Sequence, residues 1–131
     1  MTIKEEIASV LDNYIVMRLL TNSANYQISY KISNGKANEY FILSRDDTNI
    51  SYLIKYNEEF EIIVFSYSTR FYHSISTILE NKSPKLFEKL EIILIPSRYS
   101  GNSSPYIGVS QIKLNGIEEF KEFLIYLDEI I

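Results

Sequence analysis

The chain of 131 residues contains no cysteine and no tryptophan, and its only histidine is His73. Without cysteine, disulfide bonds, thiolate zinc sites and a cysteine nucleophile are excluded. A lone histidine cannot build a metal site without a nearby carboxylate cluster, and no Gly-x-Ser-x-Gly sequence marks a serine nucleophile. We interpret the Asp46–Asp47 pair as a turn, because no Glu-x-Lys sequence of a magnesium-dependent nuclease follows on the next strand. No feature of the sequence therefore identifies an enzyme or a cofactor.

Long apolar runs are also missing. No stretch approaches the roughly 18 continuous apolar residues that span a bilayer. The segment from Met1 to Glu6 lacks the basic region and the apolar run of a signal peptide. We therefore expect a cytoplasmic protein with no membrane partner. The length is close to the commonest size of one domain and no linker is visible, so we expect a single α+β domain over residues 1–131.

Alternation of apolar and polar residues predicts four strands in the first half of the chain. They are expected at residues 26–32, 40–43, 50–56 and 60–67, and the last is the most apolar and should be central. The Asn34–Gly35 pair between the first two is a strong hairpin signal. Because the connections are too short for helical crossovers, these strands should form an antiparallel meander.

Helix signals lie at both ends of the chain. A capping box from Thr2 to Glu5 precedes apolar residues at helical spacing, so a helix should run to residues 21–23. Asn115, with Glu118 three residues later, should cap a last helix whose apolar stripe reaches Ile131. Between them, residues 71–79 and the Ser83–Pro84 pair predict short helices, and residues 91–95 and 106–114 predict strands. The expected fold is α+β: a mainly antiparallel sheet of about six strands with an N-terminal and a C-terminal helix packed on it.

The net charge is −4, whereas many nucleic-acid-binding domains are basic overall. The charge is uneven, however. Five basic and two acidic residues lie between Lys82 and Lys113, whereas the last helix is acidic. A basic stretch beside an acidic helix gives either a polarised surface or two ordinary solvated faces.

Three polar segments, residues 33–38, 68–73 and 97–106, are expected to lie together at one end of the sheet. They are rich in Asn, Lys, Arg and Tyr. The first three residue types donate to phosphates and base edges, and tyrosine rings stack on bases. The same residue types form the hot spots of protein interfaces. The sequence therefore favours recognition over catalysis and leaves both nucleic acid and protein open as partners.

Three stretches resemble the N-terminal DNA-recognition domain of McrB-type modification-dependent restriction enzymes. They are the turn and strand at residues 33–43, the hairpin at residues 50–67, and the strand from residue 106 with the final helix. The resemblance implies a specificity domain of bacterial defence that flips a modified cytosine of DNA into an aromatic pocket, with Tyr40 and Phe41 near that pocket. The candidate DNA-binding residues are Lys36, Asn38, Tyr40, Phe41, Arg70, Tyr72, Lys82, Lys85, Arg98 and Tyr99.

Two other functions remain open at this stage. A small acidic protein that binds another protein, such as a toxin-immunity protein or an anti-defence inhibitor, would also fit the net charge and the acidic last helix. An enzyme would require His73 to meet a serine or a carboxylate in a cleft. Clustering of Lys36, Arg70 and Arg98 beside exposed aromatic rings would favour nucleic acid, whereas scattered basic residues beside a continuous acidic patch would favour a protein partner.

Overall fold

The first helix, α1 (Ile3–Thr21), begins at the predicted capping box. The backbone N–H of Glu5 donates to the Thr2 hydroxyl at 3.2 Å, and the backbone N–H of Thr2 donates to the Glu5 carboxylate at 3.4 Å. These bonds satisfy two of the backbone donors that the start of a helix leaves without partners. The capping box is confirmed.

The computed structural model describes residues 2–21, 28–34, 39–45, 50–67, 69–96 and 106–129. The expected α+β fold, with a helix near each end, is confirmed. Besides α1, the helices are α2 (Thr69–Lys82), α3 (Pro84–Phe87) and α4 (Gly116–Leu127). The strands are β1 (Ile28–Asn34), β2 (Glu39–Arg45), β3 (Ile50–Tyr56), β4 (Glu61–Ser66), β5 (Leu90–Pro96) and β6 (Tyr106–Asn115).

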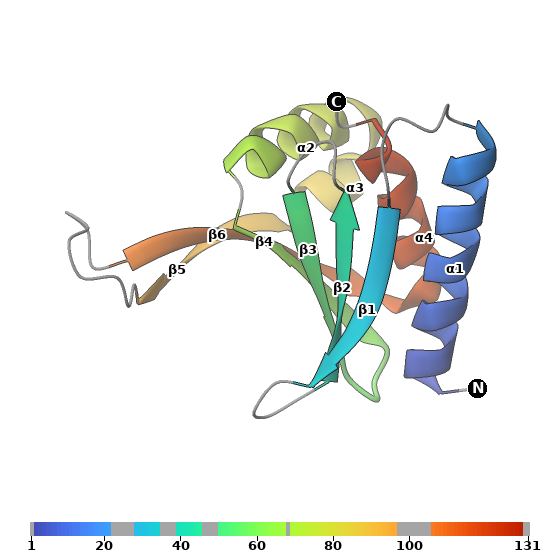
Figure 1. The fold of residues 1–131 in the computed structure, drawn as a ribbon. Helices are drawn as coiled ribbons and strands as arrows, with labels where there is room; N and C mark the ends of the chain where they lie inside the picture. Colours follow the sequence, from blue (N-terminus) through green and yellow to red (C-terminus); the bar gives the residue numbers. More distant parts are fainter. Residues whose placement is uncertain are drawn as a thin grey trace.

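These strands form one six-stranded antiparallel sheet in the order β1-β2-β3-β4-β6-β5. The predicted meander of the first four strands is confirmed, and β4 is central as expected. Strand β6 lies between β4 and β5, so β5 forms one edge of the sheet and β1 the other. In Figure 1 the outer parts of β5 and β6 extend to the left, away from the helices.

The helices pack on one face of this sheet (Figure 1). Strand β4 shows why: Ile62 and Val64 point into the core, whereas the residues that alternate with them are half-buried on the opposite side. The Tyr52 ring lies 5.1 Å from the Phe71 ring and joins β3 to α2. One cluster of buried side chains therefore connects α1, α2, α3 and α4 to strands β2, β3, β4 and β6.

The start of α4 differs from the expectation. The Asn115 side chain makes no cap hydrogen bond; instead its backbone N–H donates to the Glu119 carboxylate at 2.9 Å. Gly116 adopts a φ of 85°, a conformation that favours glycine, and its N–H donates to the Phe60 carbonyl at 2.7 Å. This turn places Glu119 rather than Glu118 at the cap. The predicted end of the stripe at Ile131 lies outside the described residues.

Candidate functional site

The sheet face opposite the helices, called the open face below, carries an apolar and aromatic centre with lysines around it. Strand registers place its side chains, because successive residues of a strand point to opposite faces. Its main side chains are those of Lys31, Tyr40, Ile42, Leu53, Lys55, Ile63, Phe65, Tyr67, Ile93, Val109, Gln111 and Lys113. No helix of the described ranges packs on this face.

A hollow of about 170 Å³ lies at the centre of the open face. Leu53 stands opposite Phe65 across β3 and β4, and Val109 stands opposite Ile93 across β6 and β5. These four side chains line the hollow together with Lys55 and Tyr67. The Tyr67 side chain is 55% exposed. A sheet face that stays in water is usually polar, so apolar side chains around a hollow, beside an exposed ring and a lysine, indicate a contact surface.

Three lysines of the open face have no ion pair within the part of the chain that the structure describes: Lys31, Lys55 and Lys113. The Lys55 ammonium group lies 5.4 Å from the centroid of the Phe65 ring, within the range of a cation–π contact. The described carboxylates on this face are those of Glu61 and Glu91, and Glu91 accepts a hydrogen bond from the Gln111 amide. The open face is thus less acidic than the chain as a whole.

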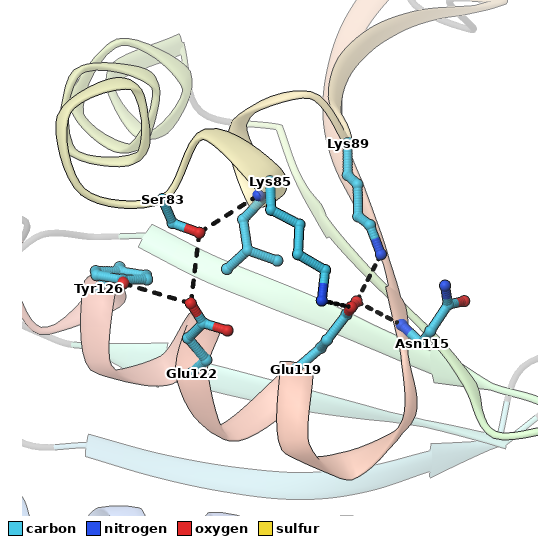
Figure 2. Close-up of polar contacts among 8 residues, drawn as sticks. Ser83, Lys85, Lys89, Asn115, Glu119, Glu122 and Tyr126 are labelled. Atoms are coloured by element: carbon cyan, nitrogen blue, oxygen red, sulfur yellow. Dashed lines mark hydrogen bonds and ion pairs between the residues drawn. The ribbon is translucent and has the colours of Figure 1, made fainter.

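The basic segment at residues 82–89 has the opposite character, because its lysines pair with the acidic last helix. Lys85 and Lys89 contact the Glu119 carboxylate at 3.0 and 2.6 Å (Figure 2). Lys82 pairs with Glu129. The basic stretch and the acidic helix therefore neutralise each other rather than forming two separate charged faces.

Glu119 is the centre of this network. Burial by itself would raise its pKa, but the Asn115 N–H and the ammonium groups of Lys89 and Lys85 outweigh burial and lower the pKa to about 2. Beside it, the hydroxyls of Ser83 and Tyr126 each donate to Glu122 at 3.4 Å (Figure 2). These bonds hold α3 and the start of β5 against α4.

We expect Glu119→Gln to lower the free energy of unfolding at neutral pH by about 1–3 kcal/mol, because it removes a charged acceptor from two lysines and a backbone N–H. The folded pKa is depressed, so this stability is present above the unfolded value of 4.5 and is lost as pH falls toward 2. Urea unfolding at several pH values measures the difference between wild type and variant. The difference should shrink on acidification, and Glu118→Gln, at an exposed carboxylate whose partner among the described residues is Lys121, should change little. A difference that does not depend on pH would contradict this role of Glu119.

The structure separates the two predicted pocket residues, Tyr40 and Phe41. Tyr40 lies half-buried on the open face. Phe41 points into the core, is fully buried and packs against the rings of Tyr30 and Tyr56 at 5.9 and 5.7 Å. The prediction that Phe41 contacts DNA is therefore wrong. Adjacent residues of a strand cannot share a face, and the core takes Phe41.

Of the other predicted residues, those that the structure describes lie on α2 and α3 and not on the open face. Lys36, Asn38, Arg98 and Tyr99 lie outside the described residues, and the structure places the Arg70 backbone in the first turn of α2 without its side chain. Tyr72 is half-buried on α2 and His73 is exposed there. Lys82 and Lys85 lie on the helical layer, bound to carboxylates.

The expectation that the three polar segments share one end of the sheet is also wrong. Strand β1 ends at Asn34, which pairs with Glu39 at the start of β2. The register of β2 with β3 and of β3 with β4 puts this point at the end of the sheet where β4 begins. Residues 69–73 follow the opposite end of β4, the end at which Tyr106 begins β6, whereas residues 35–38, 68 and 97–105 lie outside the described residues.

Sequence reasoning missed Lys55, Phe65, Tyr67 and Lys113. A signal was available, because residues 61–66 carry apolar side chains on both faces although the helices cover only one. Among the described residues no group of three or more histidines or carboxylates could hold a metal ion. None of the described helices is both long and apolar enough to span a membrane. Comparisons with protein-family models, curated proteins and solved structures gave no match.

Proposed function

We propose that this chain is a non-catalytic recognition domain that binds unpaired bases of DNA on its open face. The observation that carries the proposal is the combination of Tyr40, Phe65 and Tyr67 with lysines that have no ion pair, on a sheet face that no described helix covers. Bases stack on aromatic rings whatever their sequence, and lysines contact the phosphates between them. A single strand and a base extruded from a duplex both present such an unstacked ring.

The spacing of the open face supports this ligand. Tyr40 and Lys55 each lie one residue beyond the Phe41–Ile54 pair of β2 and β3, and Lys55 is followed across the sheet by Ile63 and Lys113. Neighbouring strands lie about 4.8 Å apart, so this row offers a ring at one end and a cation at the other over roughly 14 Å. Phe65 on β4 and Tyr67, which directly follows β4, occupy the next two rows. An extended strand of nucleic acid can cross these rows with bases on the rings and phosphates near the lysines.

The resemblance to McrB-type domains adds a role in bacterial restriction to this proposal, with a modified cytosine as the extruded base. Of the two residues expected near its pocket, Tyr40 lies on the open face, where a flipped base could stack on it. A cytoplasmic location would suit this role. The resemblance itself stays a hypothesis, because it rests on the sequence stretches alone.

A salt-titrated anisotropy assay tests the proposal with three labelled probes: single-stranded DNA, an unmodified duplex and a cytosine-methylated duplex. We expect the single strand to bind. The logarithm of its association constant should fall with the logarithm of the salt concentration with a slope of about −2, because each phosphate contact on a single strand contributes about −0.7 and the open face offers three lysines. A preference for the methylated over the unmodified duplex would support base extrusion. Absence of binding to all three probes at low salt would refute the DNA proposal.

A second candidate function, binding of a protein partner, is favoured by a groove of about 320 Å³ between α1 and α4. Its lining is mostly apolar and includes the exposed side chains of Met17 and Ile125, with Arg18 and Asp128 paired at 3.1 Å. Such a groove accommodates an apolar side chain of a protein. The two functions use different surfaces, so Ile125→Asp should leave DNA binding unchanged.

A further inference from the structure

We propose that two copies of this chain associate through the free edges of their β5 strands. The two six-stranded sheets would then continue into each other. Strand β5 pairs only with β6 among the described elements, so its other edge presents backbone N–H and C=O groups without strand partners. This inference goes beyond DNA recognition and does not depend on it.

The side chains of β5 leave most of this edge unprotected, because Pro96, which has no N–H group, blocks only its last position. Its seven residues, Leu90–Pro96, contain one charged residue, Glu91. Ile92 points to the helix side and is nevertheless 53% exposed, since the outer part of β5 extends beyond the helices (Figure 1). Ile93 points to the open face and lines its hollow. Apolar side chains on both sides of a free edge favour addition of another strand.

The other edge strand of the sheet, β1, is protected against the addition of a further strand. Strand β1 carries Lys31 between Ser29 and Ser33 on the open face. On the helix side, the Tyr30 hydroxyl donates to the Asp12 carboxylate of α1 at 2.5 Å. Charged and polar residues on an edge are the usual means of preventing strand addition. The charged residue of β1, Lys31, lies at the middle of its strand, whereas Glu91 lies near the beginning of β5 and leaves the middle of that edge apolar.

A second copy is the occupant that β5 fits, because the strand is self-complementary in the antiparallel direction. A twofold axis at Ile93 places Ile93 opposite its copy, Ile92 opposite Leu94, and Glu91 opposite Ile95. The two Glu91 side chains would then be four residues apart along the strand, about 14 Å, which is beyond the screening length of roughly 8 Å at physiological salt. Each Glu91 also keeps its hydrogen bond to Gln111. Pairing therefore aligns apolar residues without bringing like charges together.

Pairing at Ile93 also joins the two hollows. Ile93 and Val109 line the hollow on the β5 side, so the apolar floor of one copy would continue across the axis into that of the other. The dimer would present one open face of double width, with the lysines of both copies on it. Burial of Ile92 and Ile93 in both copies supplies the apolar contact that hydrogen bonds between strands alone lack.

Sedimentation velocity of the full chain tests the proposal. We expect a dimer that dissociates on dilution. Ile92→Lys should weaken dimerisation about tenfold or more, because twofold symmetry places a new ammonium group at two positions of the interface. The matched control is Ile32→Lys, at a position on β1 that is 46% exposed and also on the helix side. It should sediment like wild type. Circular dichroism checks that both variants remain folded.

The absence of cysteine allows a second test that leaves the edge apolar. Directly opposite residues of an antiparallel pair have Cα atoms about 4.5–5.5 Å apart, within the span of a disulfide. Ile93→Cys should therefore form a covalent dimer under mild oxidation, and Lys31→Cys on the β1 edge should not. A wild-type chain that is monomeric across the micromolar range would overturn the proposal, as would a dimer that Ile92→Lys leaves intact or equal cross-linking of the two cysteine variants. A monomer that still binds DNA would refute the dimer alone.

Discussion

Alanine in place of Phe41 is expected to lower the free energy of unfolding by about 3–5 kcal/mol. The Phe41 side chain is fully buried between the rings of Tyr30 and Tyr56, in the layer between the sheet and α1. Its removal exposes no binding residue; it leaves a cavity that the surrounding side chains fill only in part. Any loss of DNA binding by this variant should follow its loss of folded protein.

Chemical unfolding measures this effect, and Tyr40→Ala is the matched control. Tyr40 is the neighbouring residue, of similar size, but it lies half-buried on the open face. We expect its replacement to cost about 1 kcal/mol or less, because truncation at the surface leaves no closed cavity. Equal costs for the two variants would show that the assignment of their faces is wrong.

The Tyr67→Ala variant should bind single-stranded DNA about tenfold to a hundredfold more weakly than wild type, with its stability nearly unchanged. The Tyr67 ring is 55% exposed at the rim of the hollow, and base stacking on such a ring contributes about 1–3 kcal/mol. A double variant with Tyr40→Ala should lose more, since Tyr40 lies on β2 and Tyr67 directly after β4, so that the two rings can hold different bases.

Tyr72→Ala provides the control for this experiment. Tyr72 is also a candidate from the sequence, but it lies half-buried on α2, away from the open face. Anisotropy titrations at one salt concentration compare the three variants with wild type. If Tyr72→Ala weakens binding as much as Tyr67→Ala, the binding surface lies elsewhere or the variants act through stability.

Most of the fold could be predicted because each element carries its own signal. The alternation in residues 50–56, the Asn34–Gly35 turn and the Thr2 capping box act over a few residues, and the structure contains the corresponding strands and helix. The position of β6 between β4 and β5 was not predicted. No local pattern determines it, since it depends on which strand the β5–β6 hairpin presents to β4.

The candidate site was harder to predict because residue type alone does not determine which face a side chain occupies. Tyr40 and Phe41 were equivalent in sequence, and the core separates them. Lys82 and Lys85 looked available, but their carboxylate partners, Glu129 and Glu119, lie more than thirty residues away in sequence. The open face is built from alternate residues of strands β1 to β6, so no contiguous sequence motif marks it.

Mapping of amide resonances by NMR during titration with single-stranded DNA tests the central claim most directly. If the open face is the recognition surface, the largest shifts should cluster at Tyr40, Lys55, Phe65, Tyr67 and Lys113, and the α3 and α4 resonances should move little. Shifts concentrated on α3 and α4, or no shifts with DNA in excess, would contradict the assignment of the open face as a DNA-binding surface.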